Sequence, residues 1–92
     1  MGKVEIVLFS ALAQIVGEKK IEVEASTLKD ALNSLRIKFG NEFNDKLFEE
    51  DGNVRKFINI YVNGRDARFL KNLETALNSG DSINLVPAVS GG

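Results

Sequence analysis

The stretch TLKDALNSLRIKFG, residues 27–40, contains the clearest helix of this 92-residue chain. Thr27 is a good N-cap, and Asp30 follows three residues later, which makes an approximate capping box. Gly40 is expected to end the helix. The apolar side chains recur at helical spacing, at Leu28, Ala31, Leu32, Leu35 and Phe39. A stripe of this width can cover a small sheet, so the rest of the chain should supply the strands.

Segments rich in alternating, β-branched or aromatic residues lie on both sides of this helix. The strands expected are residues 3–9, 20–24, 57–62, 65–68 and 82–86. The pair Asn63-Gly64 favours a type I′ hairpin turn. Pro87 cannot donate to a strand ladder and should mark the end of pairing. Residues 10–16 predict one or two helical turns, with Ser10 as the cap and Gly17 as the end.

The element order is a hairpin, a helix and then further strands, without βαβ repetition. This order predicts an α+β domain, with a mixed sheet of about five strands wrapped on one main helix. We expect the first and last strands to pair at the sheet centre. Residues 1–92 should form a single domain, with residues 87–92 as a protruding C-terminal tail.

Residues 41–56 predict a short helix or turn that is pinned to the edge of the core. The apolar residues that would pin it are Phe43, Leu47 and Phe48. The acidic run Glu49-Glu50-Asp51 could be interpreted as a metal site. Because it lacks a defined ligand spacing, we interpret it as a solvated turn and expect no metal site.

The composition excludes several classes of chemistry. The chain has no Cys and no His, which removes disulfides, thiol nucleophiles, zinc sites of the usual type and imidazole catalysis. Its 12 basic and 13 acidic residues are interspersed, so we expect no nucleic-acid partner. No apolar run is long enough for a membrane span or a signal peptide, and we therefore expect a cytoplasmic protein without a membrane partner.

Strand periodicity predicts a second apolar surface, on the sheet face away from the helix. The large side chains on that face are Val7, Phe9, Phe57, Tyr61 and Val86. Because the chain has only one helix of useful length, we expect these residues to form an exposed patch that binds a protein partner. The alternative is that part of residues 41–56 folds over them.

The chain ends in Val89-Ser90-Gly91-Gly92. A terminal Gly-Gly has no side chain beyond Ser90, so it can be drawn extended into a slot too narrow for a Cβ atom. The terminal carboxylate is a chemical handle: once activated with ATP, it can become an acyl-adenylate and accept sulfur or an amine. The alternative is an end without a role, since chain termini are often disordered.

The whole chain resembles the ubiquitin-like, β-grasp sulfur carriers of the MoaD/ThiS family. The stretch GDSINLVPAVSGG, residues 80–92, is similar to the C-terminus of the MoaD-type small subunit of molybdopterin synthase, with a Gly-Asp turn, an apolar strand, proline, valine, a small residue and Gly-Gly. The first strand ending in Phe9, the helix closing at Val16-Gly17 and the hairpin pair Asn63-Gly64 also match. Ala88 departs from the family, in which a second proline is common.

The resemblance implies a sulfur carrier in molybdenum or tungsten cofactor biosynthesis. An adenylating enzyme of the ubiquitin-activating type would use ATP to adenylate Gly92, and a sulfurtransferase would convert it to a thiocarboxylate. The tail, with Gly91, Ser90 and Val89, would insert into the large subunit of molybdopterin synthase and deliver sulfur to the pterin precursor. The carrier would bind no cofactor itself and would not be catalytic alone.

Three alternatives remain open. The first is a related sulfur carrier for thiamine thiazole or tRNA thiolation, although thiazole carriers tend to lack much of a segment like residues 41–56. The second is a ubiquitin-like protein modifier that is joined to lysine amines through Gly92. The third is a β-grasp interaction module in which the Gly-Gly ending is accidental.

Overall fold

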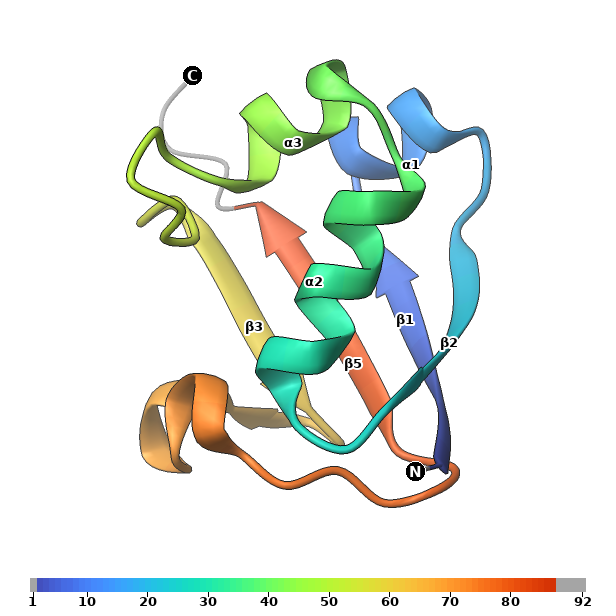
Figure 1. The fold of residues 1–92 in the computed structure, drawn as a ribbon, viewed down its shortest axis with the longest axis vertical. Helices are drawn as coiled ribbons and strands as arrows, with labels where there is room; N and C mark the ends of the chain where they lie inside the picture. The colour runs from blue at the N-terminus through green and yellow to red at the C-terminus, as the bar shows by residue number, and fades with distance from the viewer. Residues whose placement is uncertain (1, 88–92) are drawn as a thin grey trace.

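The computed structural model of the protein describes residues 2–87. Its elements, shown in Figure 1, alternate between strands and short helices along the chain. They are β1 (Gly2–Leu8), α1 (Ala11–Val16), β2 (Lys20–Ala25), α2 (Leu28–Lys38), α3 (Asn41–Leu47), β3 (Ile58–Val62), β4 (Arg65–Asp66), the 3-10 helices η1 (Ala67–Phe69) and η2 (Asn72–Glu74), and β5 (Ser82–Pro87).

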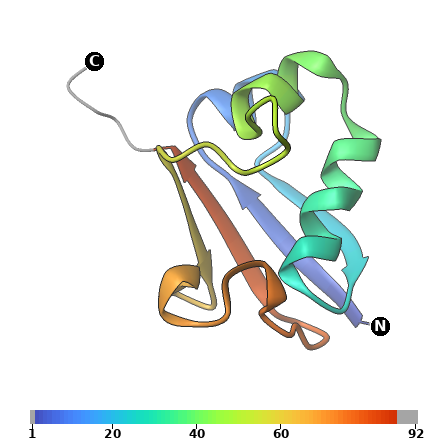
Figure 2. The same ribbon diagram turned by 60° about the vertical axis from the view of Figure 1, so that its left-hand side comes forward.

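The five strands form one mixed sheet in the order β2-β1-β5-β3-β4. The central strands β1 and β5 are parallel, while the neighbouring pairs β1–β2, β3–β5 and β3–β4 are antiparallel. The helix α2 crosses one face of this sheet, as Figures 1 and 2 show. This arrangement is the β-grasp, or ubiquitin-like, fold, and it confirms the predicted fold class and the central pairing of the first and last strands.

The core lies between α2 and the central strands. Alternate residues of β1 and β5 meet the apolar stripe of α2, and each of these side chains is at most 2% exposed. They are Val4, Ile6 and Leu8 from β1, Ile83 and Leu85 from β5, and Leu28, Ala31, Leu32 and Leu35 from α2. The periods of two and 3.6 residues therefore identified the buried faces correctly.

Two predicted helix caps differ in the structure. Thr27 caps α2 as expected, because its hydroxyl oxygen accepts a 3.2 Å hydrogen bond from the backbone N–H of Asp30. Gly40, however, does not end α2: Phe39 leaves the helix in an extended conformation, and Gly40 instead begins α3 by accepting a hydrogen bond from the N–H of Asn44. Only Phe39 and Gly40 therefore separate the end of α2 from the start of α3.

The first short helix shows the other difference. Ser10 lies at the N-cap of α1 with φ at 53°, and its side chain makes no capping hydrogen bond. The tight turn out of β1 requires this left-handed backbone, which prevents the predicted cap geometry. The helix ends as predicted, with Gly17 at φ 84° and its N–H bonded to the carbonyl of Ala13.

Residues 41–56 contribute more to the core than the sequence indicated. Phe43, Leu47 and Phe48 are 1%, 0% and 8% exposed and belong to the same buried cluster as α2. The acidic loop after them is folded on itself, since the Asp51 carboxylate accepts hydrogen bonds from the backbone and side chain of Asn53. Within residues 2–87, no group of three or more His, Cys, Asp or Glu side chains is placed to hold a metal ion.

The strand ends also shift from the predicted boundaries. β3 begins at Ile58 and leaves Phe57 outside, while β5 continues through Pro87, which is paired with Ile58. The short return strand β4 stops after two residues, because the chain turns into η1 at Ala67. None of the helices in residues 2–87 has the length and apolar character to cross a membrane.

Candidate functional site

The sheet face opposite α2, called here the outer face, is built by the central strands. Three of its residues lie side by side across the sheet, since Val7 of β1 pairs with Asn84 of β5, and Asn84 pairs with Tyr61 of β3. Lys20 and Asp66 extend this row at its two ends, opposite Val7 and Tyr61 respectively. The row is therefore apolar and aromatic with polar residues interleaved and a charge at each end.

The exposure of the predicted patch is uneven. Phe57, just before β3, is 44% exposed, and Phe9, Tyr61 and Val86 are partly exposed. Val7 is only 9% exposed, so the prediction that it is an exposed member of the patch is wrong. Its position on a central strand explains this, because longer side chains flank it on both neighbouring strands. Contact of these five residues with a partner stays a prediction.

A lysine borders the patch at its β1 end. The ammonium nitrogen of Lys19 lies 5.3 Å from the centre of the Phe9 ring, within the range of a cation–π interaction. The backbone carbonyl of Lys19 also accepts a 2.7 Å hydrogen bond from the N–H of Leu8, which anchors the turn before β2. Sequence reasoning missed this contact, because no local pattern links the two residues.

The C-terminal strand leads from the outer face toward the end of the chain. Val86, on the outer face, is paired with Asn59, and Pro87 is the last residue that the structure describes. The predicted reactive residue Gly92 lies outside the described residues. The residues predicted to insert into a partner, Val89, Ser90 and Gly91, lie outside them as well.

A hydrogen-bonded turn fixes the start of β5. Asn63 and Gly64 have φ values of 51° and 86°, as the predicted type I′ hairpin requires. The side chain of Asn63 also accepts a 2.9 Å hydrogen bond from the N–H of Ser82 and donates one of 3.1 Å to the carboxylate of Asp81. The hairpin thus holds the register of β5, and this second role of Asn63 was not visible in the sequence.

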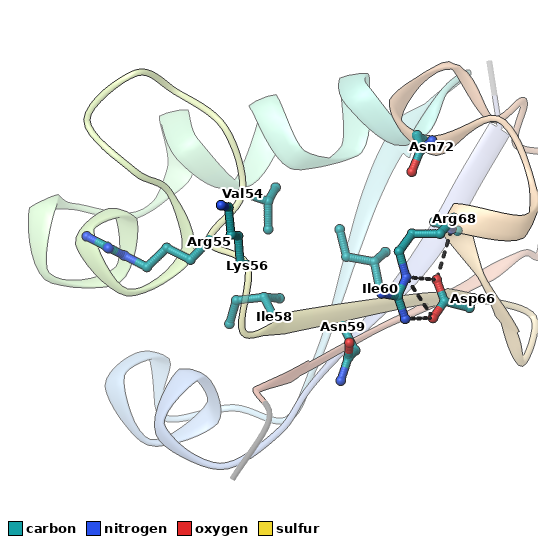
Figure 3. A pocket seen from close by; sticks show the side chains of 10 residues that line it. Val54, Arg55, Lys56, Ile58, Asn59, Ile60, Asp66, Arg68 and Asn72 are labelled. Carbon is teal, nitrogen blue, oxygen red and sulfur yellow. Dashed lines mark hydrogen bonds and ion pairs between the residues drawn. The ribbon is translucent and has the colours of Figure 1, made fainter. Parts of the chain in front are cut away.

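A hollow of about 400 Å³ opens at the edge of β3, as Figure 3 shows. An ion pair forms part of its wall, with a guanidinium nitrogen of Arg68 2.8 Å from a carboxylate oxygen of Asp66. The hydrogen bonds from Arg68 hold the pKa of Asp66 below its ordinary value, and the same carboxylate raises the pKa of Arg68. The same carboxylate also caps η1, because it accepts a hydrogen bond from the backbone N–H of Arg68.

The geometry of residues 2–87 provides surfaces for binding and a strand that carries the C-terminal residues. The chain has neither Cys nor His, and the described pockets are shallow hollows at the surface. Such a domain is suited to present a chemical group to a partner.

The comparison with protein families agrees with this arrangement. The ThiS family model matches residues 6–92. The chain therefore belongs to the ThiS family, the ubiquitin-like sulfur carriers that include the MoaD type.

Two curated relatives are similar to most of the chain. A candidate sulfur carrier protein of Archaeoglobus fulgidus is 37% identical over 76 residues, which cover 83% of this chain and 85% of that protein. Small archaeal modifier protein 3 of Haloferax volcanii is 31% identical over 93 residues, which cover 98% of this chain and 99% of that protein.

Three solved structures share the fold. SAMP1 of Haloferax volcanii is 33% identical with a TM-score of 0.85, covering 99% of this chain and 100% of that one. CysO of Amycolatopsis orientalis, solved as a complex with BexX, is 30% identical with a TM-score of 0.82, covering 97% and 99%. A candidate subunit 1 of molybdopterin converting factor from Pyrococcus furiosus is 25% identical with a TM-score of 0.73, covering 97% and 100%.

These comparisons confirm the family that the sequence resembles and the β-grasp fold. The protein is a small ubiquitin-like sulfur carrier. The relatives' names divide between sulfur carriers, protein modifiers and a molybdopterin factor, so the acceptor of the carried sulfur is a matter for proposal.

Proposed function

We propose that this protein carries sulfur as a thiocarboxylate on Gly92 and donates it to the pterin precursor of molybdopterin, as the small subunit of molybdopterin synthase. The observation that carries the proposal is the family match, which extends through residue 92 and so includes both terminal glycines. The chain has no thiol of its own, so the Gly92 carboxylate is the group on which sulfur would travel.

The chemistry requires activation of Gly92 by a partner. A carboxylate is a poor acyl donor, so an adenylating enzyme would transfer AMP from ATP to the Gly92 carboxylate and release pyrophosphate. A sulfur nucleophile supplied by a sulfurtransferase would then displace AMP and leave the thiocarboxylate. The partners would provide the acid-base groups and the charge stabilisation for these steps. ATP is thus a substrate of the activating enzyme in this scheme.

The fold supports the proposal by joining a binding surface to the reactive end. Val86 lies on the outer face, one residue before Pro87. A chain spans at most about 3.6 Å per residue, so the five residues after Pro87 can reach no farther than about 18 Å. A partner that docks on the outer face must therefore have its reactive centre within that distance of the end of β5.

The pterin acceptor is supported by one comparison, the likeness to the Pyrococcus furiosus molybdopterin converting factor subunit. Under this proposal the large subunit of molybdopterin synthase would bind the C-terminal residues. Gly91, Ser90 and Val89 would extend into its active site and bring Gly92 to the pterin precursor. The two glycines would pass where a side chain could not.

A second function is favoured by different relatives. Small archaeal modifier protein 3 is similar over nearly the whole chain, and SAMP1 shares the fold with a TM-score of 0.85. By this likeness we propose, as the second candidate, that activated Gly92 is joined to a lysine amine of a target protein. Both functions use the same adenylate and differ only in the nucleophile that displaces AMP.

One experiment tests the two candidates together. The protein ending at Gly92 and a variant lacking Gly92 would each be incubated with a cognate activating enzyme, ATP and a sulfur donor. One portion would receive the molybdopterin synthase large subunit with the pterin precursor, and another a host-cell extract. Dithiolene formation that depends on Gly92 supports the pterin function, whereas a Gly92-dependent ladder of conjugates supports the modifier function. Equal activity of the truncated variant would refute both, provided that thermal melts show the same fold.

A further inference from the structure

The edge of the sheet is open next to β3. The return strand β4 pairs only with Tyr61 and Val62, at the far end of β3. Residues Ile58 to Ile60 are paired with β5 on one side, and no strand of residues 2–87 pairs with them on the other. An unpaired stretch of this kind presents backbone groups that can bind an additional strand.

The hydrogen-bond pattern shows which backbone groups are free. The N–H of Asn63 bonds to the carbonyl of Ser82 in β5. The backbone groups of successive residues in a strand point to opposite sides, so those of Ile58 and Ile60 point away from β5, toward the open edge. The N–H of Ile58 donates a hydrogen bond to the carbonyl of Arg55. The ladders, turns and side-chain bonds of residues 2–87 leave the carbonyl of Ile58 and the N–H of Ile60 available.

These two groups can bond to an added strand opposite Asn59. In a parallel ladder, a single residue donates its N–H to the carbonyl before its partner and accepts from the N–H after it. Here Asn59 would be the partner, flanked by the carbonyl of Ile58 and the N–H of Ile60. An antiparallel neighbour can use the same two groups, because they flank Asn59 as in a non-hydrogen-bonded antiparallel pair. The free groups therefore fix the position of an added strand and allow either direction.

The hollow at this edge has walls of defined chemistry. Figure 3 shows Val54, Arg55 and Lys56 toward the start of β3 and Asp66, Arg68 and Asn72 toward its end, with the side chains of Ile58 and Ile60 between them. Ile58 and Ile60 therefore form an apolar floor. Ile60 is partly exposed there, although it packs on the core, because β4 is too short to cover it.

The charge of the walls is positive. The residues that line the hollow include three cations, Arg55, Lys56 and Arg68, and one carboxylate, Asp66, which is paired with Arg68. The Nε of Arg55 is hydrogen-bonded to the carbonyl of Asp45, and Figure 3 shows the Arg55 side chain pointing away from β3. Lys56 is exposed and makes no ion pair within residues 2–87. An occupant with acidic side chains would therefore gain attraction from Lys56.

We propose that this edge of β3 is a second binding site, which takes an extended acidic peptide segment of a protein partner as a short added strand. The partner's backbone would bond to Ile58 and Ile60, its apolar side chain would lie on the apolar floor, and a flanking carboxylate would meet Lys56. A second copy of this chain does not fit, because two edges with the same cations repel each other. The site ends opposite Pro87, beside the start of the C-terminal residues.

An NMR titration of the ¹⁵N-labelled full chain tests the proposal. The probe is a capped hexapeptide with two central valines flanked by glutamates. We expect amide shift changes confined to residues 54–60 and 66–72, slower hydrogen exchange of the Ile60 amide, and a dissociation constant of about 1 mM or tighter. Lys56→Glu should weaken binding about fivefold, as for a surface ion pair. Lys38→Glu, an exposed change outside the hollow with the same charge effect, should leave the affinity unchanged.

Two peptide controls separate the parts of the proposal. A peptide with N-methylated valines cannot donate to the carbonyl of Ile58, and a peptide with lysines in place of glutamates is repelled by the walls. Both should fail to bind. Equal binding of the N-methylated peptide would refute strand addition, and equal binding of the lysine peptide would refute the charge argument. Shifts on the outer face instead, or no shifts, would overturn the site. The variant lacking Gly92 should bind the probe normally, so this test is independent of the sulfur-carrier function.

Discussion

Replacement of Leu85 by alanine should destabilise the domain strongly. Leu85 is 0% exposed and lies on β5 between β1 and β3, facing α2. The change removes an isopropyl group, which costs about 2.4 kcal/mol at about 0.8 kcal/mol per buried carbon, and the cavity brings the total to about 3 kcal/mol. The total free energy of unfolding of a domain of this size is about 5–14 kcal/mol. We expect Tm to fall by about 12–24 °C in a thermal melt followed by circular dichroism.

The neighbouring residue provides the control. Val86 points to the outer face and is partly exposed, so Val86→Ala should cost about 1 kcal/mol or less, mainly through lower strand propensity. The two variants differ by one position on the same strand. If Val86→Ala lowered Tm as much as Leu85→Ala, the outer face would be as well covered as the core, and the assignment of the two faces would be refuted.

Three further predictions concern other surfaces. Gly2→Ala should destabilise by about 1–3 kcal/mol in a urea melt, because a Cβ there would lie 2.6 Å from the backbone of Ser79; an unchanged midpoint would contradict this close packing. Asp66→Asn should lower Tm near neutral pH, because it removes the carboxylate that pairs with Arg68. The difference in Tm between the parent and the variant should vanish as pH falls through the lowered pKa of Asp66, since protonation then removes the same pairing in the parent. A difference in Tm that persists in acid would refute this prediction. Phe9→Asp should weaken pull-down of a partner enzyme while Tm changes little, and loss of folding would instead show that Phe9 belongs to the core.

The elements and their buried faces could be predicted from the sequence because both depend on local periodicity. The apolar stripe of α2, which begins at Leu28, lies on one face of the helix. In the same way, Val4, Ile6 and Leu8 lie on one face of β1, and both faces are buried. The hairpin at Asn63-Gly64 was equally predictable, since only a few residue pairs tolerate two positive φ angles.

The remaining features depend on contacts between distant segments. The side chain of Asn63 bonds to Ser82 and Asp81, 19 and 18 residues away, and no local pattern signals such a bond. The low exposure of Val7 results from the order of strands in the sheet. The open edge at Ile60 exists because β4 ends after two residues, where Ala67 turns into η1.

For the candidate site, the sequence predicted the kind of protein more fully than the surface it uses. The terminal Gly-Gly and the preceding strand indicated the family, which the comparison confirmed over residues 6–92. The role proposed for Gly92 is chemical and would depend on partner enzymes, so neither periodicity nor packing in the isolated domain bears on it.

The most direct test of the sulfur-carrier proposal is the intact mass of the protein after incubation with ATP, a cognate adenylating enzyme and a sulfur donor. We predict a gain equal to the replacement of one oxygen atom by sulfur, and no gain in the variant lacking Gly92. An unchanged mass, with the same enzyme shown to thiolate another carrier, would contradict the account.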